Sequence, residues 1–159
     1  MNFSPSLIAA FVALLALNAC GGGDGYGAHS NDDASGSSEV KTLRIADTEY
    51  GSGPAAVAGD TLTVTYIGYL YTNGFSVDSG SGLPNRGLRI DSATTAAPLK
   101  FKLGTGAVIP GWDQGLLGAK ASMARSLIIP ASLAYGAKGT AAVPPNAALV
   151  FDIKVISIN

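Results

Sequence analysis

The sequence is poor in the side chains that most enzymes use for covalent or metal-assisted chemistry. Its 159 residues include one Cys, one His and one Trp, and 13% of them are charged. A single Cys excludes an internal disulfide, and one Cys with one His cannot supply the four ligands of a structural zinc site. The one His, His29, lies in a Gly/Ser/Asp-rich stretch, whereas a nucleophile–histidine pair needs a rigid scaffold. We therefore expect no metal, no cofactor and no activated nucleophile.

Clusters of basic residues are also missing. The net charge is −1, and all ten Lys and Arg residues are scattered over residues 40–159, with no patch that interleaves them with aromatic residues. This distribution gives no support to nucleic-acid binding. Residues 20–39, by contrast, hold four acidic residues and no basic one.

The longest apolar run is too short to span a membrane as a helix. Residues 7–17 are eleven consecutive apolar residues, whereas a spanning helix needs about 20, so the run has the length of a signal-peptide core. It leads into Leu17-Asn18-Ala19-Cys20, which resembles a bacterial lipobox. We expect residues 1–19 to be a lipoprotein signal peptide and Cys20 to be the lipidated mature N-terminus on the bacterial cell envelope. An ordinary secretory signal with an unrelated Cys is the alternative.

Two further parts follow this signal. Residues 20–39 are rich in Gly, Ser and Asp, and are expected to form a flexible linker because they cannot bury enough apolar area to order themselves. Residues 40–159 carry the aliphatic and aromatic side chains of a single folded domain. No helical dimerisation segment precedes this domain, so a monomer on a tether is expected.

From residue 40 onward the pattern favours β-strands. Apolar and polar residues alternate, or β-branched and aromatic residues dominate, in short runs separated by Gly and Pro. The predicted strands are 41–45, 61–71, 99–103, 122–129 and 148–158. Residues 74–87 are polar and Gly-rich, and are expected to be either a functional flap or a disordered insertion between strands.

One helix is expected, over residues 110–117. Pro110 suits the first helical position, and Trp112 and Leu116 share a face four residues apart. Gly111 and Gly115 weaken the helix, so packing against a sheet has to hold it. Strands before and after one short helix predict an α+β domain in which an antiparallel sheet folds over that helix.

Three stretches of the domain together resemble one known family. They are VTYIG at 64–68, LGTGAVIPGWDQGLLG at 103–118 and LIIPASLAYGAKGTAAVPPNAALVFDI at 127–153. Their combination is similar to the FKBP-type peptidyl-prolyl cis-trans isomerases, the macrolide-binding immunophilins, over essentially all of residues 40–158. The resemblance implies a twisted antiparallel β-sheet wrapped around one short α-helix.

The resemblance also implies a pocket for proline. Trp112 would form its floor, the Tyr135 hydroxyl and the Ile109 backbone N–H would donate to substrate carbonyls, and Asp91 would hold Tyr66 in place. The catalytic positions are then Tyr66, Asp91, Trp112 and Tyr135. The other substrate-contacting positions are Ile90, Leu99, Val108, Ile109, Val143 and Phe151. Ile90 and Leu99 stand where the family usually has Phe, which predicts a wider and less aromatic pocket.

The Phe-Asp-Ser motif of the family has two candidates in this sequence. They are Val77-Asp78-Ser79 and Ile90-Asp91-Ser92. We choose Asp91, because it lies eight residues before Leu99, whereas Asp78 would leave the intervening segment more than a dozen residues too long. Residues 69–87 then resemble the longer loop of some bacterial members.

The expected reaction suits a domain without reactive side chains. Rotation about an X–Pro bond breaks nothing and is slow only because the twisted amide loses resonance, a barrier of about 18–20 kcal/mol. An apolar, water-poor pocket favours the less polar twisted state. We expect a peptidyl-prolyl cis-trans isomerase that acts on proline-containing polypeptides among exported or envelope proteins, binds macrolide inhibitors, and is held at the membrane by its lipid. A non-catalytic chaperone or binding module for Pro-containing segments, or a structural protein with a vestigial pocket, stay open as alternatives.

Overall fold

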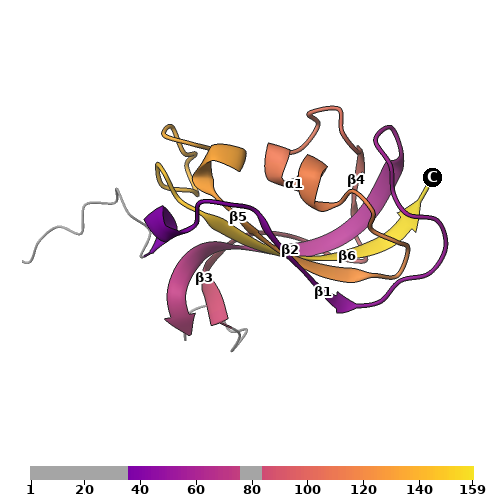
Figure 1. The fold of residues 1–159 in the computed structure, drawn as a ribbon, viewed down its shortest axis with the longest axis horizontal. Coiled ribbons are helices and arrows are strands. Elements are labelled where there is room, and N and C mark those ends of the chain that lie inside the picture. The colour runs from indigo at the N-terminus through magenta and orange to yellow at the C-terminus, as the bar shows by residue number, and fades with distance from the viewer. Residues whose placement is uncertain (1–35, 76–83) are drawn as a thin grey trace, which may run out of the picture.

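One antiparallel sheet makes up most of the domain. The computed structural model describes residues 36–75 and 84–159. The strands are β1 (Arg44–Glu49), β2 (Thr61–Phe75), β3 (Pro84–Ala93), β4 (Leu99–Lys102), β5 (Ala124–Ile129) and β6 (Leu149–Ile158). They follow the spatial order β1-β5-β6-β2-β3. β4 pairs with the first part of β2, and β3 pairs with the rest of β2 on the same edge. Figure 1 shows the sheet twisting beneath the single short α-helix.

That helix, α1 (Pro110–Gly115), lies on one face of the sheet. Its two glycines allow the close approach: a Cβ on Gly111 would collide with Ile129, and one on Gly115 with Leu127, both on β5. Two 3-10 turns, Ser37–Glu39 and Ala131–Leu133, complete the helical structure of the described residues. The helix therefore owes its place to packing on β5 rather than to its own propensity.

The main core fills the space between this helix and the sheet. Leu62 and Val64 of β2 are fully buried there, as the two-residue period of the strand requires. The other fully buried large side chains of this main core are Leu103, Leu116, Leu127, Ile129, Leu149, Ile153 and Val155. Trp112 joins this core from the helix, so the site described below is continuous with it.

A smaller apolar cluster lies outside this main core. Val40 packs there with Tyr69 and Tyr71 of β2 and with Ala148 and Val150. Residues 36–39 belong to the same region, because the Ala148 N–H donates to the Ser37 hydroxyl at 3.0 Å and the Asn73 amide donates to Glu39 at 3.0 Å. Residues 36–39 of the expected linker 20–39 thus contact the sheet. The signal peptide and residues 20–35 of that linker lie outside the described residues.

The predicted α+β architecture is confirmed, with one strand missed. The expected strands are found with shifted ends; the first moves to 44–49, and the second continues to Phe75. β3 was not expected as a strand, because its sequence PNRGLRIDSA lacks alternation, yet it pairs with β2 along an irregular register. Residues 74–75 and 84–87 of the expected flap are therefore strand; residues 76–83 lie outside the described residues. No described helix is both long enough and apolar enough to cross a membrane.

Candidate functional site

A small cavity opens beside the N-terminus of α1. Its volume is about 190 Å³, and its walls come from β2, β3, β4, β6, the loop before α1 and the loop after the second 3-10 turn. The lining residues are Tyr66, Asp91, Leu99, Ala107, Val108, Ile109, Trp112, Tyr135 and Phe151. Most of them are aromatic or aliphatic, and the polar side-chain groups among them are the Asp91 carboxylate, the hydroxyls of Tyr66 and Tyr135 and the indole N–H of Trp112.

Trp112 is the centre of an aromatic cluster at this cavity. It is 3% exposed, and its ring meets Tyr66 and Phe151 edge to face, with ring centroids 5.0 and 5.2 Å apart. Phe101 lies behind it at 5.7 Å. The indole Nε1 is buried without a hydrogen-bond partner among the described residues.

A glycine on β2 makes room for one wall. Gly68 lies opposite Phe151 of β6 in the sheet, and a Cβ on Gly68 would overlap the Phe151 ring. The ring therefore occupies the space that a side chain at position 68 would need. Any larger residue at position 68 would push Phe151 into the cavity or out of the aromatic cluster.

A short hydrogen bond joins Tyr66 to Asp91. The Tyr66 hydroxyl donates to Asp91 Oδ2 at 2.6 Å, and the Ser92 N–H donates to Asp91 Oδ1 at 2.8 Å. Burial, then the hydrogen bond and negative charge of Asp91, raise the pKa of the Tyr66 hydroxyl well above its usual value. Tyr66 is therefore a neutral hydroxyl held in one orientation at any physiological pH.

The loop that carries Val108 and Ile109 is fastened to the helix it precedes. Asp113 of α1 accepts the N–H groups of Gly104 and Gly106, at 2.8 and 2.9 Å, with its two carboxylate oxygens. The Ile109 carbonyl accepts from the Trp112 N–H at 2.9 Å, whereas the Ile109 N–H has no acceptor among the described residues. A free backbone donor thus stands at the rim of an apolar cavity.

Tyr135 lines the cavity from the loop that follows the second 3-10 turn. It is 40% exposed, and its hydroxyl has no hydrogen-bond partner among the described residues. The loop that follows turns back through hydrogen bonds from the Thr140 N–H to the Val143 carbonyl and from the Asn146 N–H to the Gly136 carbonyl. The loop is therefore internally braced, and Tyr135 stands at its base with a hydroxyl free to donate.

Comparison with known proteins shows which family this chain belongs to. The model of the family described as FKBP-type peptidyl-prolyl cis-trans isomerase matches residues 53–156, more than half of the chain. The chain belongs to this family. The FK506-binding protein of Streptomyces anulatus is 38% identical over 128 residues, which are 79% of this chain and 94% of that protein. The FK506-binding protein 4 of Emericella nidulans is 40% identical over 123 residues; the chain spans only 23% of its length.

Solved structures show the same FKBP fold. FkpA from Escherichia coli superposes with a TM-score of 0.59 at 35% identity, covering 74% of this chain and 48% of that one. AtFKBP13 gives a TM-score of 0.59 at 32% identity, covering 74% of this chain and 93% of that one.

The structure brings most of the residues expected from the FKBP resemblance to one cavity. The four expected catalytic positions line it, as do Leu99, Val108, Ile109 and Phe151. Ile90 and Val143 do not: Ile90 packs against the main core, and Val143 is buried in it. Cys20 and Asp78 lie outside the described residues, so Asp91 is the carboxylate that the structure places beside Tyr66.

Sequence reasoning missed two residues of this FKBP site. Ala107 lines the cavity but carries no chemical signal that could single it out. Asp113 shapes the loop, and its place in the first turn of a helix was a usable signal, because a carboxylate there can accept backbone N–H groups. Among the described residues, no group of three or more His, Cys, Asp or Glu side chains could hold a metal ion.

Proposed function

We propose that the chain is a peptidyl-prolyl cis-trans isomerase that turns X–Pro bonds of polypeptides in the cavity at α1. The observation that carries this proposal is the combination of an aromatic floor with two free donors. Trp112 offers the floor, while the Ile109 N–H and the Tyr135 hydroxyl have no acceptors of their own among the described residues. Such a site suits a ring of proline flanked by carbonyl groups.

The mechanism needs only shape, dryness and placed donors. The proline ring rests on Trp112, and the surrounding apolar side chains exclude water from the amide that rotates. Without water the planar, more polar amide loses its hydrogen bonds, so the twisted amide becomes easier to reach. The Ile109 N–H and the Tyr135 hydroxyl donate to the carbonyl groups on either side of the proline. These hydrogen bonds hold the X–Pro bond in one orientation in the cavity. Lowering the barrier by about 5–7 kcal/mol would accelerate rotation by roughly four to five decades.

Tyr66 and Asp91 act on this centre in different ways. Tyr66 forms part of the wall, and Asp91 is a positioning residue that holds the Tyr66 hydroxyl. The carboxylate also places a negative charge at one side of the cavity. Holding the hydroxyl requires the hydrogen bond of 2.6 Å between the two side chains.

An inhibition experiment tests the assignment of activity to this cavity. The rate of cis-to-trans conversion of a short peptide with a Leu–Pro bond is measured with and without the macrolide FK506. Acceleration by the protein that FK506 abolishes is the expected result. Acceleration unaffected by saturating FK506 would place the activity elsewhere, and no acceleration at all would overturn the proposal.

A non-catalytic role is the second candidate. Leu99 lines the cavity at a position where the family resemblance leads one to expect Phe, so one ring that would grip the substrate is replaced by a smaller side chain. Fold and pocket do not guarantee turnover. Binding of a proline-containing peptide without any change in its rate of isomerisation would select this chaperone or binding role over catalysis.

We also propose that the chain acts as a monomer on the cell envelope, anchored through lipid on Cys20 and serving exported proteins. The apolar run 7–17 and the position of the only Cys directly after it support this proposal. Several acyl chains on one Cys would give stable anchoring where one chain is marginal. Labelling with radioactive palmitate in a bacterial host tests it: wild type should carry label in the membrane fraction and Cys20→Ser should not. Equal labelling of the two, or none in either, would contradict it.

A further inference from the structure

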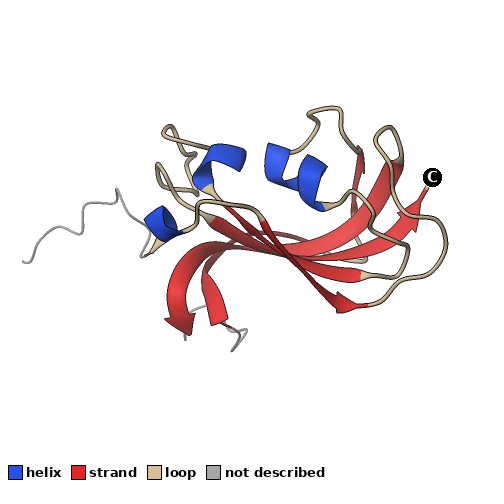
Figure 2. Cartoon of the chain, viewed as in Figure 1, coloured by secondary structure: helices blue, strands red, loops and turns tan. Residues whose placement is uncertain are grey.

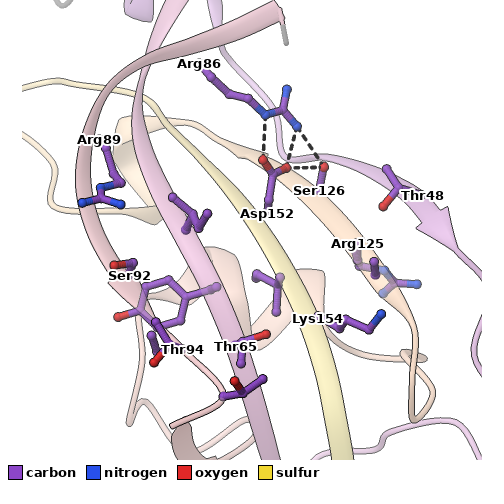
Figure 3. A pocket seen from close by; sticks show the side chains of 16 residues that line it. Thr48, Thr65, Arg86, Arg89, Ser92, Thr94, Arg125, Ser126, Asp152 and Lys154 are labelled. Carbon is purple, nitrogen blue, oxygen red and sulfur yellow. Dashed lines mark hydrogen bonds and ion pairs between the residues drawn. The ribbon is translucent and has the colours of Figure 1, made fainter. Parts of the chain in front are cut away.

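A second and larger cavity lies outside the site described above. Its volume is about 720 Å³, and it is lined by the sheet and by the strand β3 that bends away from α1 (Figure 3). We call it the outer groove. Its side walls carry the labelled residues Arg89, Ser92 and Thr94 on the side of β3, and Thr48, Arg125 and Lys154 on the side of β5 and β6. Cavities of roughly 300–1,000 Å³ are typical of ligand sites in proteins.

The shape of the outer groove is fixed by a partly buried ion pair. Arg86 of β3 reaches across to β6, where its guanidinium donates to the two carboxylate oxygens of Asp152 at 2.7 and 2.5 Å. Ser126 of β5 donates to the same carboxylate and accepts from Arg86 at 3.1 Å. Arg86 is only 9% exposed. A bidentate pair of this kind holds β3 over the sheet, so the groove is formed before any ligand arrives.

The lining of the groove offers apolar surface and unused hydroxyl groups. Ile67 contributes an aliphatic side chain that is exposed there. Four threonines and one serine add hydroxyls that make no hydrogen bond among the described residues: Thr48, Thr65, Ser92, Thr94 and Thr95. An extended polypeptide presents both a polar backbone and apolar side chains, and this mixture of surfaces matches it.

The charge of the groove favours an acidic occupant. Four basic residues line it against one acidic residue, Asp152. Arg86, Arg125 and Lys154 are neutralised by ion pairs with Asp152, Asp47 and Glu49. Arg89 is exposed and has no ion pair among the described residues. One guanidinium is therefore left to meet a carboxylate from outside.

The groove meets the proline cavity at one residue. Tyr66 lines both cavities, and no other residue does. Tyr66 lies where β2 changes its neighbour on this edge of the sheet. β2 pairs with β4 up to Val64 and with β3 from Tyr66 onward. The two cavities thus adjoin at this change of partner, and one polypeptide can occupy both.

We propose that the outer groove binds an acidic, extended segment of the same polypeptide whose X–Pro bond enters the proline cavity, with Arg89 meeting one of its carboxylates. This proposal rests on the proposed function. It makes the protein selective for prolines that have acidic residues a few positions away. Electrostatic complementarity of this kind serves specificity and the rate of encounter more than raw affinity.

A kinetic experiment tests the selectivity. The value of kcat/KM is measured for Ala–Leu–Pro–Phe and for longer peptides that contain this core. Each longer peptide carries three Glu, three Ser or three Lys residues, which begin three positions before or three positions after the core. Wild type should prefer one of the Glu peptides over its Ser counterpart by about three- to fivefold, the size expected of one partly exposed ion pair. Arg89→Gln should remove the preference, and Arg89→Glu should transfer it to the Lys peptide. Equal kcat/KM values for all extensions in wild type would overturn the proposal.

A matched variant controls for general charge. Arg44 is an exposed arginine on β1 that does not line the groove. Arg44→Glu changes the net charge by the same amount as Arg89→Glu, and should keep the preference of wild type. Loss of the preference in both variants would assign it to the overall charge and contradict the groove.

A binding experiment separates this proposal from the proposed function. The probe is a fluorescent, proline-free peptide with three Glu residues, whose anisotropy is followed at low and high salt. Binding that Arg89→Glu abolishes, in a protein without isomerase activity, would leave the groove standing and overturn the proposed function. Activity on Ala–Leu–Pro–Phe without binding of the probe would do the reverse. Binding to anionic vesicles in place of the peptide would show that the occupant is a lipid surface, and would also overturn the polypeptide assignment.

Discussion

Tyr66 occupies a position on which several features of the domain converge. Its ring packs on Trp112 and faces Phe151, and its hydroxyl is held by Asp91. It also forms the boundary between the proline cavity and the outer groove. The side chains around Tyr66 are therefore the residues whose substitution tests both cavities.

Asp91 is expected to act through Tyr66. Asp91→Ala should lower kcat/KM for a short Leu–Pro peptide by about tenfold, or about 1.4 kcal/mol, because the Tyr66 ring loses its anchor. Asp91→Asn should retain much of the rate, since its amide oxygen still accepts the hydrogen bond. In Asp91→Ala, titration of tyrosinate absorbance should also show a lower pKa for Tyr66 than in wild type.

Two controls sharpen this prediction. Glu49→Ala removes a carboxylate from an exposed ion pair and should leave the rate unchanged. Full activity of Asp91→Ala beside an inactive Asp78→Ala would show that the other Asp-Ser pair of the sequence is the functional one.

Tyr135 is expected to donate a hydrogen bond to the substrate. Tyr135→Phe keeps the ring and removes only the hydroxyl, so kcat/KM should fall by about three- to tenfold while the melting temperature stays the same. Tyr50, which is 93% exposed and does not line the cavity, provides the matched control. A rate for Tyr135→Phe equal to that of Tyr50→Phe would remove this hydroxyl from the mechanism.

The raised pKa of Tyr66 predicts how stability depends on pH. In the unfolded chain the hydroxyl loses its proton near pH 10, whereas in the folded domain it keeps the proton to higher pH. The folded state then binds more protons than the unfolded state, so the free energy of unfolding falls as pH rises above 10. Urea unfolding between pH 9 and 11 should show a shallower decline for Tyr66→Phe than for wild type. Parallel slopes would mean that Tyr66 is not shielded in solution.

At the scale of the element, α1 positions the cavity although it is only six residues long. Its glycines bring it close to β5, and its Trp112 becomes the floor. Its Asp113 fastens the preceding loop through Gly104 and Gly106. The helix and the loop therefore form one unit that carries four of the residues lining the cavity, Ala107, Val108, Ile109 and Trp112.

Asp113→Ala tests the coupling between loop and helix. Two backbone N–H groups lose a charged acceptor, which should lower the free energy of unfolding by about 1–3 kcal/mol. KM should rise more than kcat falls, because the freed loop weakens binding through Ile109 and Val108 before it affects rotation. Gln114→Ala, on the exposed side of the same helix, should change neither quantity. Unchanged KM with lost stability would limit Asp113 to a structural role.

Across the whole molecule, the sequence predicted the features that follow from hydrophobic periodicity or from the spacing of motifs. The strands that bury Leu62, Val64, Ile153 and Val155 alternate cleanly, so their faces were predictable. The family motifs predicted the cavity because they lie in segments that the fold joins: the strand β2, the helix with the loop before it, and the stretch from β5 to β6.

The rest could not be predicted because it depends on contacts distant in sequence. β3 has no alternating pattern, and its place is held by the pairing with β2 and by Arg86, whose partner Asp152 lies 66 residues away. Residues 36–39 read as linker by composition, yet Ser37 and Glu39 find partners on the sheet. Val143 was expected at the cavity but is buried in the core, because the loop carrying it folds back on itself.

The central claim is that the cavity at α1 catalyses rotation about X–Pro bonds. Exchange NMR on Ala–Leu–Pro–Phe measures this directly, because it follows interconversion of the cis and trans peptides at equilibrium without a coupled protease. With a catalytic amount of wild-type protein, the exchange rate should rise by orders of magnitude above that of the peptide alone, and Tyr135→Phe and Asp91→Ala should each reduce the increase. An exchange rate equal to that of the free peptide, in a protein shown to bind it, would contradict the account.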